Sequence, residues 1–195
     1  MKKLLLMSAV AVFGLSNVNA QDDTTTGGFA EGDLFVSGSL GYNSTKMGDF
    51  KTNTFEFSPS VGYFITENIA LELNLLVGTS TDEDDDKSSN FGAGLGATYF
   101  FTPASQFSFT VGAGVAYSTF KFEPDGGDEF KSNAFGVVVA PGVNYFISDD
   151  FALRASIGAL SYTSDKADVD GAEAENTFGL NLDLSDINFG IIYKF

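Results

Sequence analysis

The sequence predicts an all-β fold, an eight-stranded antiparallel up-and-down transmembrane β-barrel. Three observations lead to this prediction. Eight segments alternate between apolar and other residues with a period of two. The connections between them alternate between short turns and longer polar stretches, as in barrels that keep each kind of connection at its own end. The apolar residues occupy one face of each segment, while the other face carries mostly small residues.

The eight predicted strands each place apolar side chains at every second position. They cover residues 34–42, 55–64, 71–78, 91–99, 107–117, 135–145, 153–160 and 187–195. The eighth strand is expected to start earlier, near Thr177, but Phe178 and Leu180 alternate out of phase with Ile187 onward. One extra residue near Ser185 restores the phase, as a β-bulge does; a break into two pieces is the alternative.

The connections predict two different ends of the barrel. Short turns are expected at residues 66–68, 102–106 and 148–150, and longer polar connections at 44–52, 79–89, 121–131 and 164–176. Fourteen of the 26 acidic residues lie in three of these longer connections. Because charge is costly inside the lipid band, its concentration in acidic loops fits a membrane-spanning barrel.

The first twenty residues read as a targeting segment. Lys2 and Lys3 precede an apolar stretch from Leu4 to Leu15, and Ala20 ends a short cleavage-like motif. A membrane anchor is the alternative, disfavoured because a spanning helix needs about 20 apolar residues. We therefore predict a cleaved signal peptide over 1–20, a flexible lead-in over 21–32, and a single barrel domain over 33–195.

The composition excludes several functional classes. The chain has no Cys and no His, which rules out disulfides, thiol nucleophiles and imidazole bases. Its net charge of −16 disfavours nucleic-acid binding, because acidic surfaces repel phosphate backbones. Hydrophobic residues make up 44% and charged residues 18%, which is not the composition of a disordered chain.

The small-residue face indicates which side of the sheet meets lipid. Twelve glycines fall on this face of the predicted strands, together with Ser, Thr, Ala and Asn. A soluble barrel, the alternative, would expose this face to water and should carry charges there. Small side chains instead suit the narrow lumen of an eight-stranded barrel. The apolar face is therefore expected to face lipid.

A repeated motif marks the short-turn end. Three predicted strands close with Tyr-Phe, a hydrophobic residue, and Thr or Ser, and Tyr193 occupies the equivalent place at the C-terminus. A phenol ring is suited to a membrane interface, with its ring in apolar surroundings and its hydroxyl in water. We predict an aromatic girdle of Tyr63, Tyr99, Tyr145 and Tyr193; ordinary strand-forming tyrosines are the alternative.

Two charges inside the predicted lumen stand at equivalent positions. Glu72 and Arg154 each follow a girdle tyrosine by nine residues, on the third and seventh strands. Since these strands lie on opposite sides of an eight-stranded barrel, we predict an ion pair across the lumen, joined by Glu56. A lone buried charge is costly. Two separately solvated charges are the alternative.

The acidic loops invite a metal hypothesis that the spacing does not support. Asp82, Asp84 and Asp86 match the start of a calcium-binding loop, but Lys87 stands where Gly is required and Ala93 where Glu is required. Asp168 and Asp170 form an equally weak candidate. We predict no metal site; loose Ca²⁺ or Mg²⁺ binding that bridges to lipopolysaccharide phosphates is less favoured than solvated loops.

The Tyr-Phe turns and the C-terminal stretch from Phe189 to Phe195 resemble those of small Gram-negative outer-membrane β-barrels. The chain is most similar to the general outer-membrane-protein β-barrel domain of many Bacteroidetes-type proteins. This resemblance implies periplasmic termini and surface-exposed long loops. It also implies a signal for the barrel-assembly machinery. The signal residues are Phe189, Ile191, Tyr193 and Phe195.

The same resemblance implies contact with outer-membrane lipid and lipopolysaccharide, but no single activity. The expected function is a non-enzymatic envelope or surface-interaction role through the loops, as a monomer without cofactors. A narrow channel for ions or small solutes is the alternative, although an eight-stranded lumen is about filled by its side chains. Carboxylate-only catalysis is formally open.

Overall fold

The computed structural model describes residues 27–47, 50–82, 86–157, 159–181 and 187–195. The predicted signal peptide, the first part of the lead-in, Asp84 and the predicted irregularity near Ser185 lie outside these residues. Among the described residues, no helix is long and apolar enough to cross a membrane. The strands are β1 (Leu34–Met47), β2 (Phe50–Phe64), β3 (Ile69–Thr81), β4 (Lys87–Phe100), β5 (Phe107–Glu123), β6 (Phe130–Phe146), β7 (Phe151–Ile157), β8 (Ala159–Ala167), β9 (Glu175–Asn181) and β10 (Ile187–Lys194).

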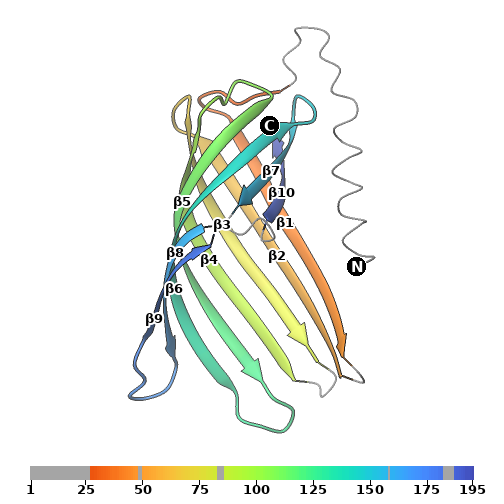
Figure 1. The fold of residues 1–195 in the computed structure, drawn as a ribbon, viewed down its shortest axis with the longest axis vertical. Helices are drawn as coiled ribbons and strands as arrows, with labels where there is room; N and C mark the ends of the chain where they lie inside the picture. The colour runs from red at the N-terminus through yellow and green to blue at the C-terminus, as the bar shows by residue number, and fades with distance from the viewer. Residues whose placement is uncertain (1–26, 48–49, 83–85, 158, 182–186) are drawn as a thin grey trace.

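These strands form a closed antiparallel barrel of eight spanning strands (Figure 1). β1 to β6 pair consecutively, and β6 then pairs with both β7 and β8. β7 and β8 are thus two parts of one spanning strand. β9 and β10 are likewise two parts of the next one, since β9 pairs with β8 and β10 pairs with β7. Pairing of β1 with β10, from Phe35–Lys194 to Gly38–Ile191, closes the barrel. The predicted fold class is confirmed.

The seventh spanning strand contains an offset that the sequence did not reveal. On β6, Gly142 pairs with Ser156 of β7, whereas Val139 pairs with Leu160 of β8. Between these two pairs, two residues on β6 therefore correspond to three positions on its neighbour, an excess of one as in a β-bulge. The outward face consequently changes from Leu153 on β7 to Leu160 on β8, both exposed. Continuous alternation over 153–160 was therefore a wrong expectation, because the small residues there do not mark either face.

The connections lie at two ends, as predicted, but the long ones are shorter than predicted. Turns at 65–68, 101–106 and 147–150 share one end, here called the turn end, with the C-terminus, drawn at the top of Figure 1. At the opposite loop end, residues 82–86, 124–129 and 168–174 connect the strands. Polar residues continue the backbone ladder beyond the apolar stretch, as in Ser44–Asn53 and Ser80–Ser88. A polar side chain does not end a strand whose backbone still finds a partner.

The barrel is apolar outside and small or polar inside. Along β3, Leu71, Leu73 and Leu75 are 42, 53 and 41% exposed, whereas Ala70 and Glu72, which point to the other face, are buried. Along β4, Phe91 and Leu95 are likewise exposed, and the glycines between them line the lumen. This inverted arrangement matches the expected lipid-facing surface.

The buried core lies inside the barrel at the turn end. It is a cluster of eight apolar residues, most of them phenylalanines: Phe29, Phe35, Phe64, Ala70, Phe100, Phe146, Ala152 and Ile192. Gly62 permits this packing, because a Cβ at that position would overlap the ring of Phe35. Phe29 belongs to the predicted lead-in, and Gly32 N–H donates to the Phe64 carbonyl. The described part of the lead-in therefore packs into the barrel, contrary to the expectation of a flexible segment.

Candidate functional site

The repeated Tyr-Phe motif builds the turn end from both faces of the sheet. Because successive side chains of a strand point to opposite faces, an outward Tyr is followed by an inward residue. Phe64, Phe100 and Phe146 follow three of the predicted girdle tyrosines and are fully buried. Lys194 follows the fourth. The motif thus supplies an outer aromatic row together with an inner aromatic cluster.

Phe29 is inserted into the centre of this inner cluster. Its ring centroid lies 4.6 Å from that of Phe64, 4.9 Å from Phe146 and 5.3 Å from Phe35. Its backbone N–H donates to the Pro103 carbonyl at 2.8 Å. Stacked, tilted and edge-to-face contacts at these distances are favourable beyond the apolar area that they bury. Phe29 therefore acts as a plug, with a backbone hydrogen bond to one of the turns at the turn end.

Lys194 connects the segment around Phe29 to the last strand, β10. Its Nζ donates to the Gly28 carbonyl at 2.6 Å, lies 3.9 Å from a carboxylate oxygen of Asp33, and stands 5.6 Å from the ring centroid of Phe146. Gly27 N–H, on the other side of the plug, donates to Asp149 Oδ1 at 3.2 Å. The segment from Gly27 to Asp33 is thus bound to β10 and to the turn before β7.

Glu72 and Arg154 meet across the lumen directly inside the cluster. Arg154 Nη1 on β7 donates to Glu72 Oε2 on β3 at 2.6 Å. Thr98 Oγ1 donates to the other carboxylate oxygen at 2.6 Å. The Arg154 side chain is 22% exposed and that of Glu72 10%, so solvent screens this pair far less than a surface pair. The pair is charge-compensated and hydrogen-bonded on the carboxylate side.

The arginine is also held between aromatic rings. Its guanidinium carbon lies 5.6 Å from the ring centroid of Phe35 and 5.7 Å from that of Phe100. Arg154 Nε and Nη2 are buried without a hydrogen-bond acceptor among the described residues. The negative ring faces supply electrostatic compensation for these groups. The ion pair and the aromatic cluster are therefore one continuous structure.

A cavity of about 340 Å³ lies against this pair on the lumen side. It is lined by small and polar residues that include Asn74, Thr98, Thr110 and Ser156. Glu56 is not part of it. Glu56 pairs in register with Gly78, six residues along β3 from Glu72, which is about 20 Å along the strand. The expectation that Glu56 joins the pair is therefore wrong; it lines a separate cavity of about 160 Å³.

The predicted girdle and assembly-signal residues lie on the outer surface at the turn end. Tyr63 and Tyr99 are 48% and 43% exposed, while Tyr145 and Tyr193 are half-buried. Tyr193 packs its ring against Phe151 and Phe195. The remaining signal residues, Phe189, Ile191 and Phe195, are exposed. Their roles at the membrane interface and in assembly stay predictions.

The loop aspartates do not gather into a metal site among the described residues. Asp86 N–H donates to Asp82 Oδ1, and Asp86 Oδ1 in turn accepts from Asp125 N–H. Asp168 and Asp170 are exposed at the turn between β8 and β9. Asp82, Asp86 and Asp125 thus take part in hydrogen bonds that hold the loops in shape.

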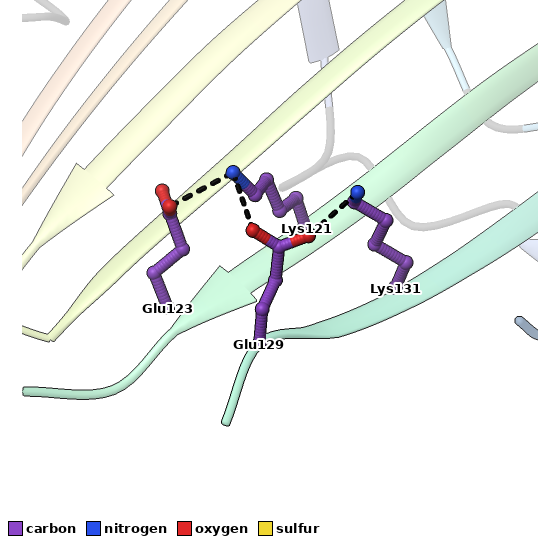
Figure 2. A network of polar contacts seen from close by, with 4 residues as sticks. All are labelled: Lys121, Glu123, Glu129 and Lys131. Carbon is purple, nitrogen blue, oxygen red and sulfur yellow. Dashed lines mark hydrogen bonds and ion pairs between the residues drawn. The ribbon is translucent and has the colours of Figure 1, made fainter. Parts of the chain in front are cut away.

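An exposed ion-pair network joins the ends of β5 and β6 (Figure 2). Glu129 lies between two lysines, with Lys121 Nζ at 2.7 Å and Lys131 Nζ at 2.6 Å from its carboxylate oxygens. Lys121 also contacts Glu123 at 2.8 Å. Hydrogen bonds from Lys121 and then Lys131 lower the pKa of Glu129 below its ordinary value of 4.5. Glu129 offsets the repulsion between two lysines that face each other across the hairpin.

Sequence reasoning missed the inner aromatic cluster, the plug and this network. The cluster had a signal, because each Phe directly follows a girdle Tyr and must therefore face inward. Phe29 had none: it is an isolated apolar residue in a polar, Gly-rich segment. Its position is decided by contacts with residues that are up to 117 positions away in the chain.

The sequence matches the family model of the outer membrane protein beta-barrel domain over residues 8–195. The chain belongs to this family. It is an outer-membrane protein with the porin-like barrel fold of Gram-negative bacteria. A search of curated proteins finds no match.

Solved barrels of the outer membrane share the family's fold. The N-terminal β-barrel domain of Pseudomonas aeruginosa OprF matches with a TM-score of 0.52 and 18% identity, covering 86% of this chain and 100% of that one. Neisserial surface protein A matches with a TM-score of 0.53 and 18% identity, covering 83% and 97%. OprG from Pseudomonas aeruginosa matches with a TM-score of 0.54 and 14% identity, covering 86% and 98%. At these identities the likeness concerns the fold alone.

Proposed function

We propose that this protein is a non-enzymatic barrel that serves envelope structure or surface interaction through its loop end. The observation that carries the proposal is the closure of the lumen at the turn end. Phe29 and its neighbours fill the barrel there, and the Glu72–Arg154 pair crosses it immediately inside. A solute that entered from the loop end would meet two successive barriers, one charged and one apolar.

Several features of the chain support a role without catalysis. The sequence has no His or Cys to act as nucleophile or base. The carboxylate of Glu72 is committed to Arg154 and Thr98. The partners that we propose are outer-membrane lipid and lipopolysaccharide around the barrel, and the assembly machinery during insertion. Divalent cations at the acidic loops remain a weaker proposal.

A narrow channel is the second candidate, favoured by the cavity of about 340 Å³ and its polar lining. Conductance across a planar bilayer distinguishes the two. We expect the purified protein to give a flat baseline. The double variant Phe29→Ala/Arg154→Ala, which removes a part of each barrier, should show openings and so demonstrates that insertion is detected. Steady single-channel steps from the unmodified protein would establish the channel and overturn the proposed role.

A further inference from the structure

All lysines of residues 21–195 except Lys194 lie near one end of the barrel. Residues 21–195 contain eight basic residues, and six of them lie at the loop end. Five of these have described side chains, one on each of β1, β4, β5, β6 and β8: Lys46, Lys87, Lys121, Lys131 and Lys166. We call these five residues the lysine belt. Lys51 of β2, the sixth, pairs in register with Lys46.

Each belt lysine stands four residues from an exposed aromatic residue on the same strand. The pairs are Lys46 with Tyr42, Lys87 with Phe91, Lys121 with Tyr117, Lys131 with Phe135, and Lys166 with Tyr162. The pairing registers run without a break between aromatic and lysine on all five strands. Because residues i and i+4 of a strand share a face, the lysines lie on the same outward face as the lipid-facing aromatics.

A polar row separates the two levels. The residue midway between each aromatic and its lysine is Ser44, Ser89, Thr119, Asn133 or Ser164. Two aromatic hydroxyls point toward this level: Tyr42 Oη donates to Asn53 and Tyr162 Oη donates to Asn176. The rings thus meet the apolar band while their hydroxyls meet polar groups on the loop side. This is the orientation of an aromatic row at a membrane interface.

The distance between the exposed aromatic residues near the loop end and the tyrosines at the turn end matches the thickness of a membrane's apolar band. Phe55 and Tyr63 on β2 are eight residues apart, and Phe135 and Tyr145 on β6 are ten apart. With a rise of about 3.4 Å per residue and a tilt of about 40°, the two aromatic rows are about 21 to 26 Å apart, close to the expected apolar band of about 25 Å. The belt lysines are four residues farther along their strands, which places them about 10 Å beyond the aromatic residues near the loop end and within reach of the lipid headgroups.

The acidic residues nearest the belt follow the lysine of their own stretch of chain toward the loops. No acid occupies the outward positions between any belt lysine and its aromatic residue. Glu123 and Glu129 lie two residues beyond Lys121 and Lys131, and Asp168 lies two residues beyond Lys166. Glu123 also pairs in register with Lys87 of the neighbouring strand. Lys46, Lys87, Lys131 and Lys166 are exposed, and Lys121 is half-exposed. Along each of these three stretches of chain the lysine therefore stands closer to the lipid-facing aromatic residue than the acid does, although Glu123 and Glu129 also contact belt lysines.

We propose that the lysine belt binds the phosphate groups of lipid headgroups in the outer leaflet. An ammonium group attracts phosphate at the membrane surface, and the long lysine side chain reaches down while its stem covers apolar surface. The proposal rests on the proposed function and deepens it, since it names the residues and the phosphate chemistry by which the barrel binds its lipid partner. It needs only that the loop end faces the outer leaflet.

Native mass spectrometry of the purified barrel can test this. The probes are diphosphorylated lipid A, dephosphorylated lipid A and inorganic phosphate, and folding is checked for every variant by heat-modifiable gel migration. We expect the unmodified protein to retain the phosphorylated lipid preferentially. The triple variant K46Q/K87Q/K166Q should bind it about 100-fold more weakly, which is about 3 kcal/mol at 1.4 kcal/mol per tenfold change.

Two matched variants separate the belt from net charge. K46R/K87R/K166R keeps the charges in place and should bind as the unmodified protein does. K46Q/K87Q/K166Q/D125N/D128N/E173Q restores the overall charge without restoring the belt, and should stay weak. Recovery of binding in this last variant would show that net charge alone matters and would overturn the proposal.

The proposal is also overturned if the triple Gln variant binds like the unmodified protein, if both lipid forms bind equally, or if millimolar inorganic phosphate binds as tightly as the lipid. The last result would assign the belt to free phosphate. Channel conductance would contradict the proposed function but would leave each of these lipid measurements unchanged, so the two failures are distinguishable.

Discussion

The turn end and the loop end are built from the same eight spanning strands but are held together differently. At the turn end, side chains from across the barrel meet in one buried cluster, sealed by Phe29 and capped by an ion pair. At the loop end, backbone ladders extend into water and the polar contacts between side chains are exposed, as between Lys121 and Glu129. Stability is therefore expected to concentrate at the turn end, and surface variation should be tolerated at the loop end.

The largest effect is expected from breaking the buried ion pair. Arg154→Leu leaves the Glu72 carboxylate buried without its cation, which should lower the free energy of unfolding by about 3–5 kcal/mol. Replacing both partners, as in Glu72→Leu/Arg154→Met, removes the stranded charge and should recover most of this loss. The free energy of unfolding of both variants can be measured by urea unfolding in detergent micelles, with the folded fraction read from heat-modifiable gel migration. If the double variant is as unstable as the single one, the pair is not the stabilising unit.

The plug provides the next test of the turn end. Phe29→Ala removes a buried ring and should cost about 3 kcal/mol. The segment from Gly27 to Asp33 should then become accessible to protease while the barrel stays folded. Phe101→Ala is the matched control, because Phe101 lies at the same end but is 56% exposed. Equal protease sensitivity of the two variants would contradict the plug.

A smaller effect is expected from crowding the cluster through the backbone. In Gly62→Ala the new methyl group would overlap the Phe35 ring, so the ring must shift, at a cost of about 1–3 kcal/mol. Gly136→Ala is a matched substitution toward the loop end, where the nearest atom to an added Cβ is the Tyr162 carbonyl oxygen at 3.9 Å. Its unfolding free energy should change by no more than about 0.5 kcal/mol. The urea midpoints of the two variants test whether packing is tight only near the plug.

The two ends also differ in how far the sequence predicts them. The outward apolar face follows directly from the period of two, and the meeting of Glu72 and Arg154 follows from two strands that align without a gap. The plug does not follow, because docking of Phe29 depends on rings contributed by β1, β2, β4 and β6. The spacing of four between lysine and aromatic is visible in the sequence. It gains meaning only when strand registers place all five lysines on one face.

The smallest effect concerns the exposed network at the loop end and is best followed through protonation. The pKa of Glu129 is lowered by hydrogen bonds from Lys121 and Lys131, so the folded hairpin favours the ionised carboxylate. Its contribution to folding is present above the ordinary carboxyl value of 4.5 and is lost as the pH falls through the lowered folded pKa.

Titration of the Glu129 side-chain carboxyl by NMR measures this contribution. The midpoint should rise toward the ordinary value in K121Q/K131Q, whereas K121R/K131R should keep it low. Salt at about 1 M should also raise the midpoint, since it shortens the screening length to about 3 Å and weakens exposed ion pairs. Because the network is exposed, the free energy of unfolding of the whole barrel should change little in either variant. This small change would contrast with the large loss expected when the buried pair at Glu72 is broken. A midpoint that stays low in K121Q/K131Q would mean that other groups hold the carboxylate ionised and that the two lysines do not stabilise the hairpin through Glu129.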